Sequence, residues 1–143
     1  MTDLLRTPRE VVARTEAGAV RITRRDAVDL ILLRADDLDQ VQRGAALAVR
    51  IARAALEHDG DMLTGLRTLY AWTSLFSEAA QTQFAVEMSK LVWASAELGH
   101  FGQLLDSFAS WLGTAEALAD GMRPDEDLTW LATGEATDVP RPE

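Results

Sequence analysis

The 143-residue chain contains no cysteine, which excludes disulfide bonds, thiolate metal sites and cysteine nucleophiles. It also has no apolar run that approaches the roughly 18 residues needed to span a membrane. The first residues include Asp3 and lack the apolar segment of a signal peptide. We therefore expect a cytoplasmic protein with no membrane partner.

Residues that commonly mark a catalytic centre are equally scarce. The two histidines, His58 and His100, stand alone in the sequence, and the acidic residues around Gly60 lack the ligand spacing of an EF-hand. The chain has no phosphate-binding glycine loop and no nucleophile elbow. We expect no enzyme activity, no metal and no cofactor. The alternative left open is an enzyme whose scattered carboxylates converge in the fold.

Positive charge is also limited, and most of it lies in the first part of the chain. The formal net charge is −9, yet residues 1–56 hold ten arginines against eight acidic residues. Residues 57–143 hold four basic residues against fifteen acidic ones. This division predicts a different partner for each part. The alternative is a solvated surface whose charge is unevenly distributed.

The N-terminal part has the pattern of a helix followed by a β-hairpin. A helix is expected over residues 7–18, where Thr7 is an N-cap candidate. Alternating apolar and polar residues predict a strand at 19–23, and a second, more apolar strand is expected at 28–34. A two-stranded sheet is only marginally stable alone, so this hairpin needs a third strand, helices or a second copy of itself as cover.

The rest of the chain has a helical pattern up to its polar end. Apolar residues at helical spacing predict helices at 35–60, 62–76, 77–99 and 100–121. The apolar stripe of the first of these helices consists of Leu38, Val41, Ala45, Val49, Ala52 and Leu56. Short connections between the helices predict an antiparallel bundle.

These patterns together predict an α+β fold with three parts along the chain. The small sheet-and-helix domain covers residues 1–58, and the helical extension covers residues 59–122. Residues 123–143 are acidic and hold three of the four prolines, which predicts a flexible tail.

The stretch TEAGAVRITRRDAVDLILLRADDL, residues 15–38, resembles the core of the prevent-host-death (Phd/YefM) antitoxin family. That family has a short helix, a strand reading V-x-I-T-R, a turn, an apolar strand, and acidic residues that open a further helix. The residues that carry the resemblance are Val20, Ile22, Thr23, Arg24, 28–33 and 36–38. The later helices resemble an all-helical extension of some actinobacterial members, through Trp72, Phe84, Phe101, Trp111 and 115–117.

The resemblance implies a symmetric dimer that binds operator DNA. The dimer would form through the hairpin, by way of Ile22, Leu30, Ile31 and Leu33. In the family, the arginine after I-T and basic residues near the start of the first helix contact DNA, which implies this role for Arg24, Arg6 and Arg9. Charge alone adds Arg21 and Arg25 to this set. For Arg24 and Arg25, the alternative is a solvated turn paired with Asp26 or Asp29.

The resemblance further implies an antitoxin that neutralises a cognate protein toxin and represses its own operon. An acidic C-terminal half suits a basic toxin. In the tail, Leu128, Trp130 and Leu131 form an apolar island that could anchor the toxin or fold back onto the bundle. Two other functions remain open: a DNA-binding regulator with no toxin, and a structural interaction protein that binds no DNA.

Overall fold

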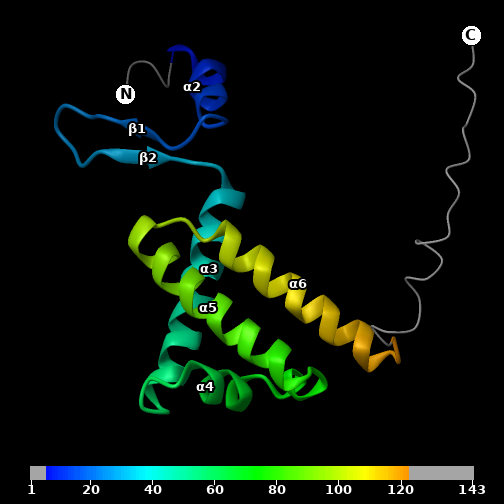
Figure 1. Cartoon of the computed structure of the whole chain (residues 1–143). Coiled ribbons are helices and arrows are strands. Elements are labelled where there is room, and N and C mark those ends of the chain that lie inside the picture. Colours follow the sequence, from blue (N-terminus) through cyan, green and yellow to red (C-terminus); the bar gives the residue numbers. More distant parts are fainter. Residues whose placement is uncertain (1–5, 123–143) are drawn as a thin grey trace, which may run out of the picture.

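The computed structural model describes residues 6–122, which form an α+β arrangement of helices and one two-stranded antiparallel sheet (Figure 1). An N-terminal unit, residues 6–34, lies at one end of a longer helical bundle, residues 35–122. The predicted α+β class and the predicted hairpin are both confirmed. Within residues 6–122, every helix is too short or too polar to cross a membrane.

The N-terminal unit consists of helix α2 (Pro8–Arg14) and strands β1 (Val20–Ile22) and β2 (Leu30–Leu32). The strands pair so that Val20 lies opposite Leu32 and Ile22 lies opposite Leu30. Helix α2 is shorter than the predicted 7–18, because the chain continues after Arg14 in turns rather than in helix.

The bundle consists of four α-helices and one short 3₁₀ segment. In chain order these are α3 (Ala35–Leu56), α4 (Met62–Leu69), η1 (Ala71–Leu75), α5 (Glu78–Leu98) and α6 (Gly102–Ala119). Local capping sets several of their ends. The Asp61 and Ser77 side chains accept hydrogen bonds from the backbone N–H groups of Thr64 and Ala80, which starts α4 and α5. Gly99 ends α5 in the left-handed conformation, at φ 69°.

The predicted helix at 62–76 is wrong as a single element. Helix α4 ends at Leu69, Tyr70 takes an extended backbone (φ −126°, ψ 94°), and η1 follows. Hydroxyl groups favour this break, because Thr73 donates its side-chain hydrogen bond to the carbonyl of Tyr70, 2.8 Å away. The change of direction brings the rings of Tyr70 and Trp72 into the core cluster.

The bundle core lies where the four helices meet. Its most deeply buried side chains are Ile51, Leu66, Phe84, Met88 and Leu104. Aromatic rings extend it, with the Phe84 centroid 5.4 Å from that of Trp72 and 5.3 Å from that of Trp111. Such ring pairs add to the stabilisation that burial alone provides.

Helix α3 buries a different face from the predicted stripe. The residues it places in the core are Gly44, Leu47, Ala48, Ile51, Ala54 and Ala55. Of the predicted stripe, Ala45 and Ala52 are half-buried, whereas Leu38, Val41, Val49 and Leu56 are exposed. The helix is apolar over a wider arc than the bundle covers, so the sequence alone did not reveal which part of that arc is the core.

The N-terminal unit, in contrast, has almost no core of its own. Among residues 6–34, only Val11 and Thr15 are buried. Figure 1 shows α2 beside the hairpin, and the hairpin standing beyond the start of α3. A unit of this size with so little buried apolar surface depends on further contacts for its stability.

Candidate nucleic-acid interface

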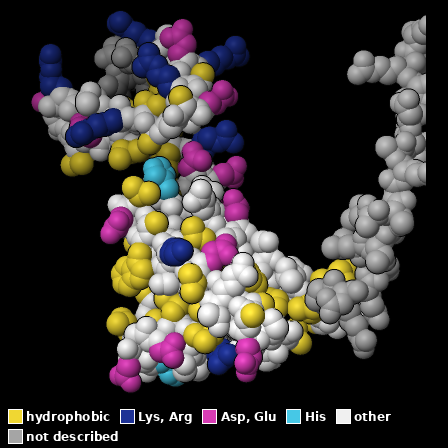
Figure 2. Space-filling model, in the orientation of Figure 1, with side chains coloured by type: hydrophobic (Ala, Val, Ile, Leu, Met, Phe, Trp, Pro, Cys, Tyr) yellow, Lys and Arg dark blue, Asp and Glu magenta, His cyan; other side chains and the backbone are white. Residues whose placement is uncertain are grey.

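Arginine side chains gather on the N-terminal unit. Residues 6–34 contain seven arginines and four acidic residues, and Figure 2 shows the Lys and Arg side chains concentrated there. The bundle carries the opposite balance, with five basic and twelve acidic residues over 35–122. The unit is therefore a locally positive surface on an acidic protein.

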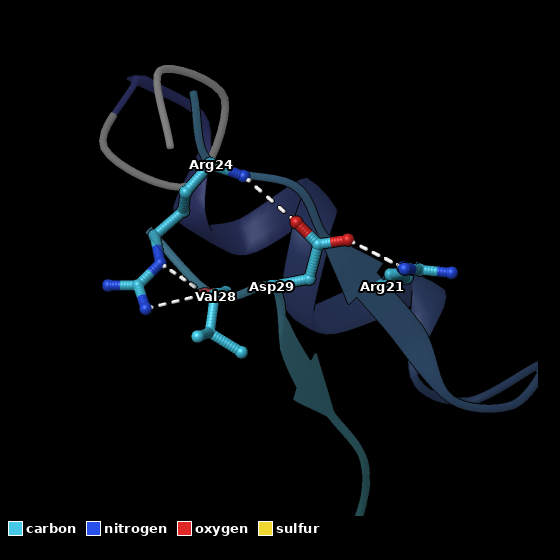
Figure 3. A network of polar contacts seen from close by, with 4 residues as sticks. All are labelled: Arg21, Arg24, Val28 and Asp29. Carbon is cyan, nitrogen blue, oxygen red and sulfur yellow. Dashed lines mark hydrogen bonds and ion pairs between the residues drawn. The ribbon is translucent and has the colours of Figure 1, made fainter. Parts of the chain in front are cut away.

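A network of polar contacts closes the turn between the two strands (Figure 3). The Asp29 carboxylate accepts a hydrogen bond from Arg21 Nε at 2.9 Å and forms an ion pair with Arg21 Nη2 at 2.7 Å. The same carboxylate accepts a hydrogen bond from the backbone N–H of Arg24 at 3.3 Å. Asp29, which lies directly before β2, therefore links the start of β2 to Arg21 in β1 and to the backbone of Arg24 after β1.

The Arg24 guanidinium is also part of this network. It donates to the carbonyl oxygen of Val28 from Nε at 2.8 Å and from Nη2 at 2.5 Å. Two of the five predicted DNA-binding arginines, Arg21 and Arg24, therefore already have protein partners. The sequence offered Asp26 or Asp29 as partners for Arg24 and Arg25, but the side chain that pairs with Asp29 is that of Arg21. The Arg24 guanidinium instead binds the carbonyl of Val28, which carries no sequence signal.

The other three predicted arginines have no such partners. Arg6, Arg9 and Arg25 are exposed and form no ion pair or side-chain hydrogen bond with the described residues. Arg14, at the end of α2, is equally exposed and unpaired, and the predicted set did not include it. Its only sequence signal is its charge. These four arginines offer unneutralised charge to a polyanion.

The apolar side chains of the hairpin are only partly covered. Of the four residues predicted at a dimer interface, Ile22 and Leu33 are half-buried, whereas Leu30 and Ile31 are exposed. Ile31 is 66% exposed and nearby Val28 is 82% exposed. Both strands are sheet edges, so each also presents backbone groups that could pair with another strand.

The polar side chains of the bundle have roles in holding its helices together. No cluster of three metal-ligating side chains occurs among residues 6–122. The main polar contact of the bundle joins α5 to α6: the Glu87 carboxylate accepts hydrogen bonds from the hydroxyl of Ser107 and from the indole Nε1 of Trp111. This contact holds the two helices together.

The two perturbed acid groups of the bundle also have structural explanations. Hydrogen bonds from Thr64 lower the pKa of Asp61 below its usual 3.8, which follows from its role as a helix cap. Burial raises the pKa of Tyr70 above its usual 10.0, and the positive charge of Arg50 partly opposes the rise.

A groove of about 350 Å³ lies at the far end of the bundle, between η1 and the end of α6. Phe76, Trp111, Leu118 and Met122 give it an apolar lining. The residues predicted to bind a toxin, Leu128, Trp130 and Leu131, lie outside the described residues.

No family model matches the chain, and neither the curated proteins nor the solved structures contain a match to it.

Proposed function

We propose that this chain is a dimeric DNA-binding antitoxin that represses its own operon and neutralises a partner toxin. The observation that carries the proposal is the positive, sparsely covered N-terminal unit on an otherwise acidic protein. Its order of helix, strand, turn and strand agrees with the resemblance of residues 15–38 to the Phd/YefM family.

The uncovered hairpin supports the dimeric part of the proposal. A second copy that pairs at the sheet edge and covers Leu30 and Ile31 would supply the stability that one copy lacks. It would also double the number of unpaired arginines on one surface. A two-fold dimer favours a palindromic operator.

The contacts in Figure 3 change which arginines we expect to act in DNA binding. Arg25, with its unpaired side chain on the turn, is the strongest candidate, and Arg9 on α2 is the next. Arg24 retains N–H groups that point away from Val28, so it can contact a phosphate while also supporting the turn. The role of Arg21 is mainly to hold Asp29.

The toxin-binding part of the proposal rests on charge and on the resemblance. The acidic bundle would attract a basic toxin, and the apolar groove near Trp111 offers a surface on which a toxin could bury a side chain. Co-expression with the neighbouring gene tests this part. We expect that gene alone to arrest growth, and this chain to relieve the arrest.

The test of DNA binding is fluorescence anisotropy with DNA from upstream of its own gene, measured across a series of salt concentrations. We expect specific binding that weakens steeply with salt, and weaker binding by Arg25→Ala. Lys90→Ala is the matched control, because it removes one exposed positive charge from α5. If Lys90→Ala weakens binding as much as Arg25→Ala does, or if no binding occurs at low salt, the proposal fails.

Because Arg21 and Arg24 already have partners within the chain, there is a second candidate function. The chain would then be a structural interaction protein whose hairpin binds another protein rather than DNA. In that case Arg24→Ala would lower the stability of the protein. Neither the wild-type protein nor any variant would bind DNA in a salt-dependent way, because the protein would not bind DNA at all.

A further inference from the structure

Helix α3 has an apolar seam that the bundle leaves open. The seam follows the four-three spacing typical of a coiled coil, and its residues are Leu38, Gln42, Ala45, Val49, Ala52 and Leu56. It extends over eighteen residue steps, or about 27 Å of helix. Five of its six positions are apolar, and only the alanines are partly covered by the bundle.

The exposure of this seam is unusual for apolar residues on a helix of this length. Val49 is 67% exposed and Leu56 is 76% exposed, and Leu38 lies exposed at the other end. Figure 1 shows α3 running from the hairpin to α4, and Figure 2 shows hydrophobic side chains on the bundle surface between these two elements. A contiguous apolar strip of this kind marks an interaction surface.

We propose that the seam pairs with the seam of a second copy of this chain, with the two α3 helices antiparallel about a two-fold axis. Successive seam residues are separated by 4, 3, 4, 3 and 4 positions, and this order is the same from either end of the helix. An antiparallel pair therefore sets Leu38 against Leu56 of the partner subunit and Ala45 against Val49 of the partner subunit. Such an interface is closed and uses one surface twice.

Charged residues beside the seam favour the antiparallel direction. Asp39 and Arg53 occupy equivalent positions, each one residue after a seam residue, and both are exposed. Arg53 also forms an exposed ion pair with Glu57, 3.0 Å away on the same helix, and its guanidinium has further N–H groups for a second carboxylate. Antiparallel pairing places Asp39 near the partner's Arg53, and the symmetry repeats this pair. Parallel pairing would instead bring together the two acidic first turns, each containing Asp36 and Asp37.

Small side chains allow the two helices to approach closely at the centre of the seam. Ala46 is exposed and lies halfway between Asp39 and Arg53, so it would face its own copy across the axis. This interface is separate from the hairpin dimer of the proposed function and does not depend on it. Together the two interfaces would assemble dimers into tetramers.

Cross-linking tests the geometry directly, because the chain contains no cysteine of its own. Ala46→Cys is expected to give a covalent dimer on oxidation or with a short bis-maleimide. Ala109→Cys, an exposed alanine on α6, is the control and is expected to stay unlinked. If Ala46→Cys links no better than Ala109→Cys, the proposed pairing is overturned.

Sedimentation equilibrium of the full chain, whose monomer is 15.7 kDa, measures the strength of the interface. The Val49→Glu variant is expected to raise the dissociation constant of the dimer about tenfold or more, because dimer formation would bury the glutamate charge without a partner. Val86→Glu, on an exposed valine of α5, is the matched control and should leave association unchanged. Circular dichroism should show both variants folded, since neither valine is in the core.

A charge exchange tests the direction of pairing. Asp39→Arg and Arg53→Asp should each weaken association, and the double variant should restore it. The hairpin variant Ile31→Asp separates the two interfaces, because it removes hairpin contacts and leaves the Ala46→Cys cross-link intact. A wild-type chain that remains monomeric at high concentration would overturn the inference, as would a double variant weaker than both single ones.

Discussion

The backbone of Gly44 in α3 lies directly against the side chain of Phe101 at the start of α6. A β-carbon built on Gly44 would stand 2.1 Å from the Phe101 β-carbon, far inside van der Waals contact. In the sequence, Gly44 is only an interruption in a helical stripe. In the structure it is the point where α6 crosses α3.

Gly44→Ala is expected to destabilise the protein, although alanine is the better helix former. The intrinsic gain is up to about 1 kcal/mol, but the displacement of α6 should give a net loss of about 1–3 kcal/mol. Gly113→Ala on α6 is the control, because nothing lies within 4 Å of its added β-carbon. That control should stabilise by about 0.5–1 kcal/mol in urea unfolding. Equal stabilisation by both changes would contradict the close contact.

Glu87→Gln is expected to lower the free energy of unfolding by about 1–2 kcal/mol. The carboxylate accepts from two donors, the hydroxyl of Ser107 and the indole N–H of Trp111 at 3.1 Å. A glutamine can still accept from the indole N–H through its oxygen and donate its NH₂ group to the Ser107 hydroxyl, but both bonds lose the charged acceptor that makes them strong. Glu97→Gln, on the exposed face of the same helix, should change stability little. Similar losses in the two variants would rule out a specific role for Glu87.

Tyr70 is the only tyrosine, so the ultraviolet absorbance of tyrosinate reports on it alone. We expect a titration midpoint above 10.0 in the folded protein, because burial disfavours the phenolate. Since the folded-state pKa is the higher one, the free energy of unfolding should fall as the pH rises above 10.0. The same titration in urea should return the midpoint to the ordinary value. A native midpoint equal to the one in urea would mean that the Tyr70 hydroxyl is solvated.

Asp61→Asn tests the cap of α4 through pH. The folded-state pKa of Asp61 is lowered, so its contribution is fully present above the ordinary value of 3.8 and is lost as the pH falls through the folded value. Wild type should therefore melt at a higher temperature than Asp61→Asn at neutral pH, and this advantage should vanish in acid. A constant difference across the pH range would mean that the charge of Asp61 has no part in the cap.

Helix and strand content was largely predictable from local patterns, whereas the break after Leu69 was not. The stretch 62–76 has continuous apolar spacing, which predicts one helix. Its hydroxyl groups and aromatic rings favour a break only once Trp72 has a core to enter, and that core comes from α5 and α6. A single-segment pattern does not contain this information.

The candidate interface was likewise predictable only in part from the sequence. The sequence identified a basic hairpin and the arginines on it. It did not reveal that the carbonyl of Val28 receives the guanidinium of Arg24, because a backbone acceptor at that point exists only after the turn has formed. We therefore expect Arg25 to contribute more to DNA binding than Arg24.

By itself, the sequence determined that α3 is a long helix with apolar residues over a wide arc, since spacing and composition are local properties. Only the tertiary structure decided which part of that arc is core: it buried Leu47 and Ile51 and left Val49 and Leu56 outside the core of the bundle. The physical reason is that burial depends on where the other helices pack. The Gly44 contact with Phe101 fixes that position, because α6 can approach α3 closely only where a side chain is missing.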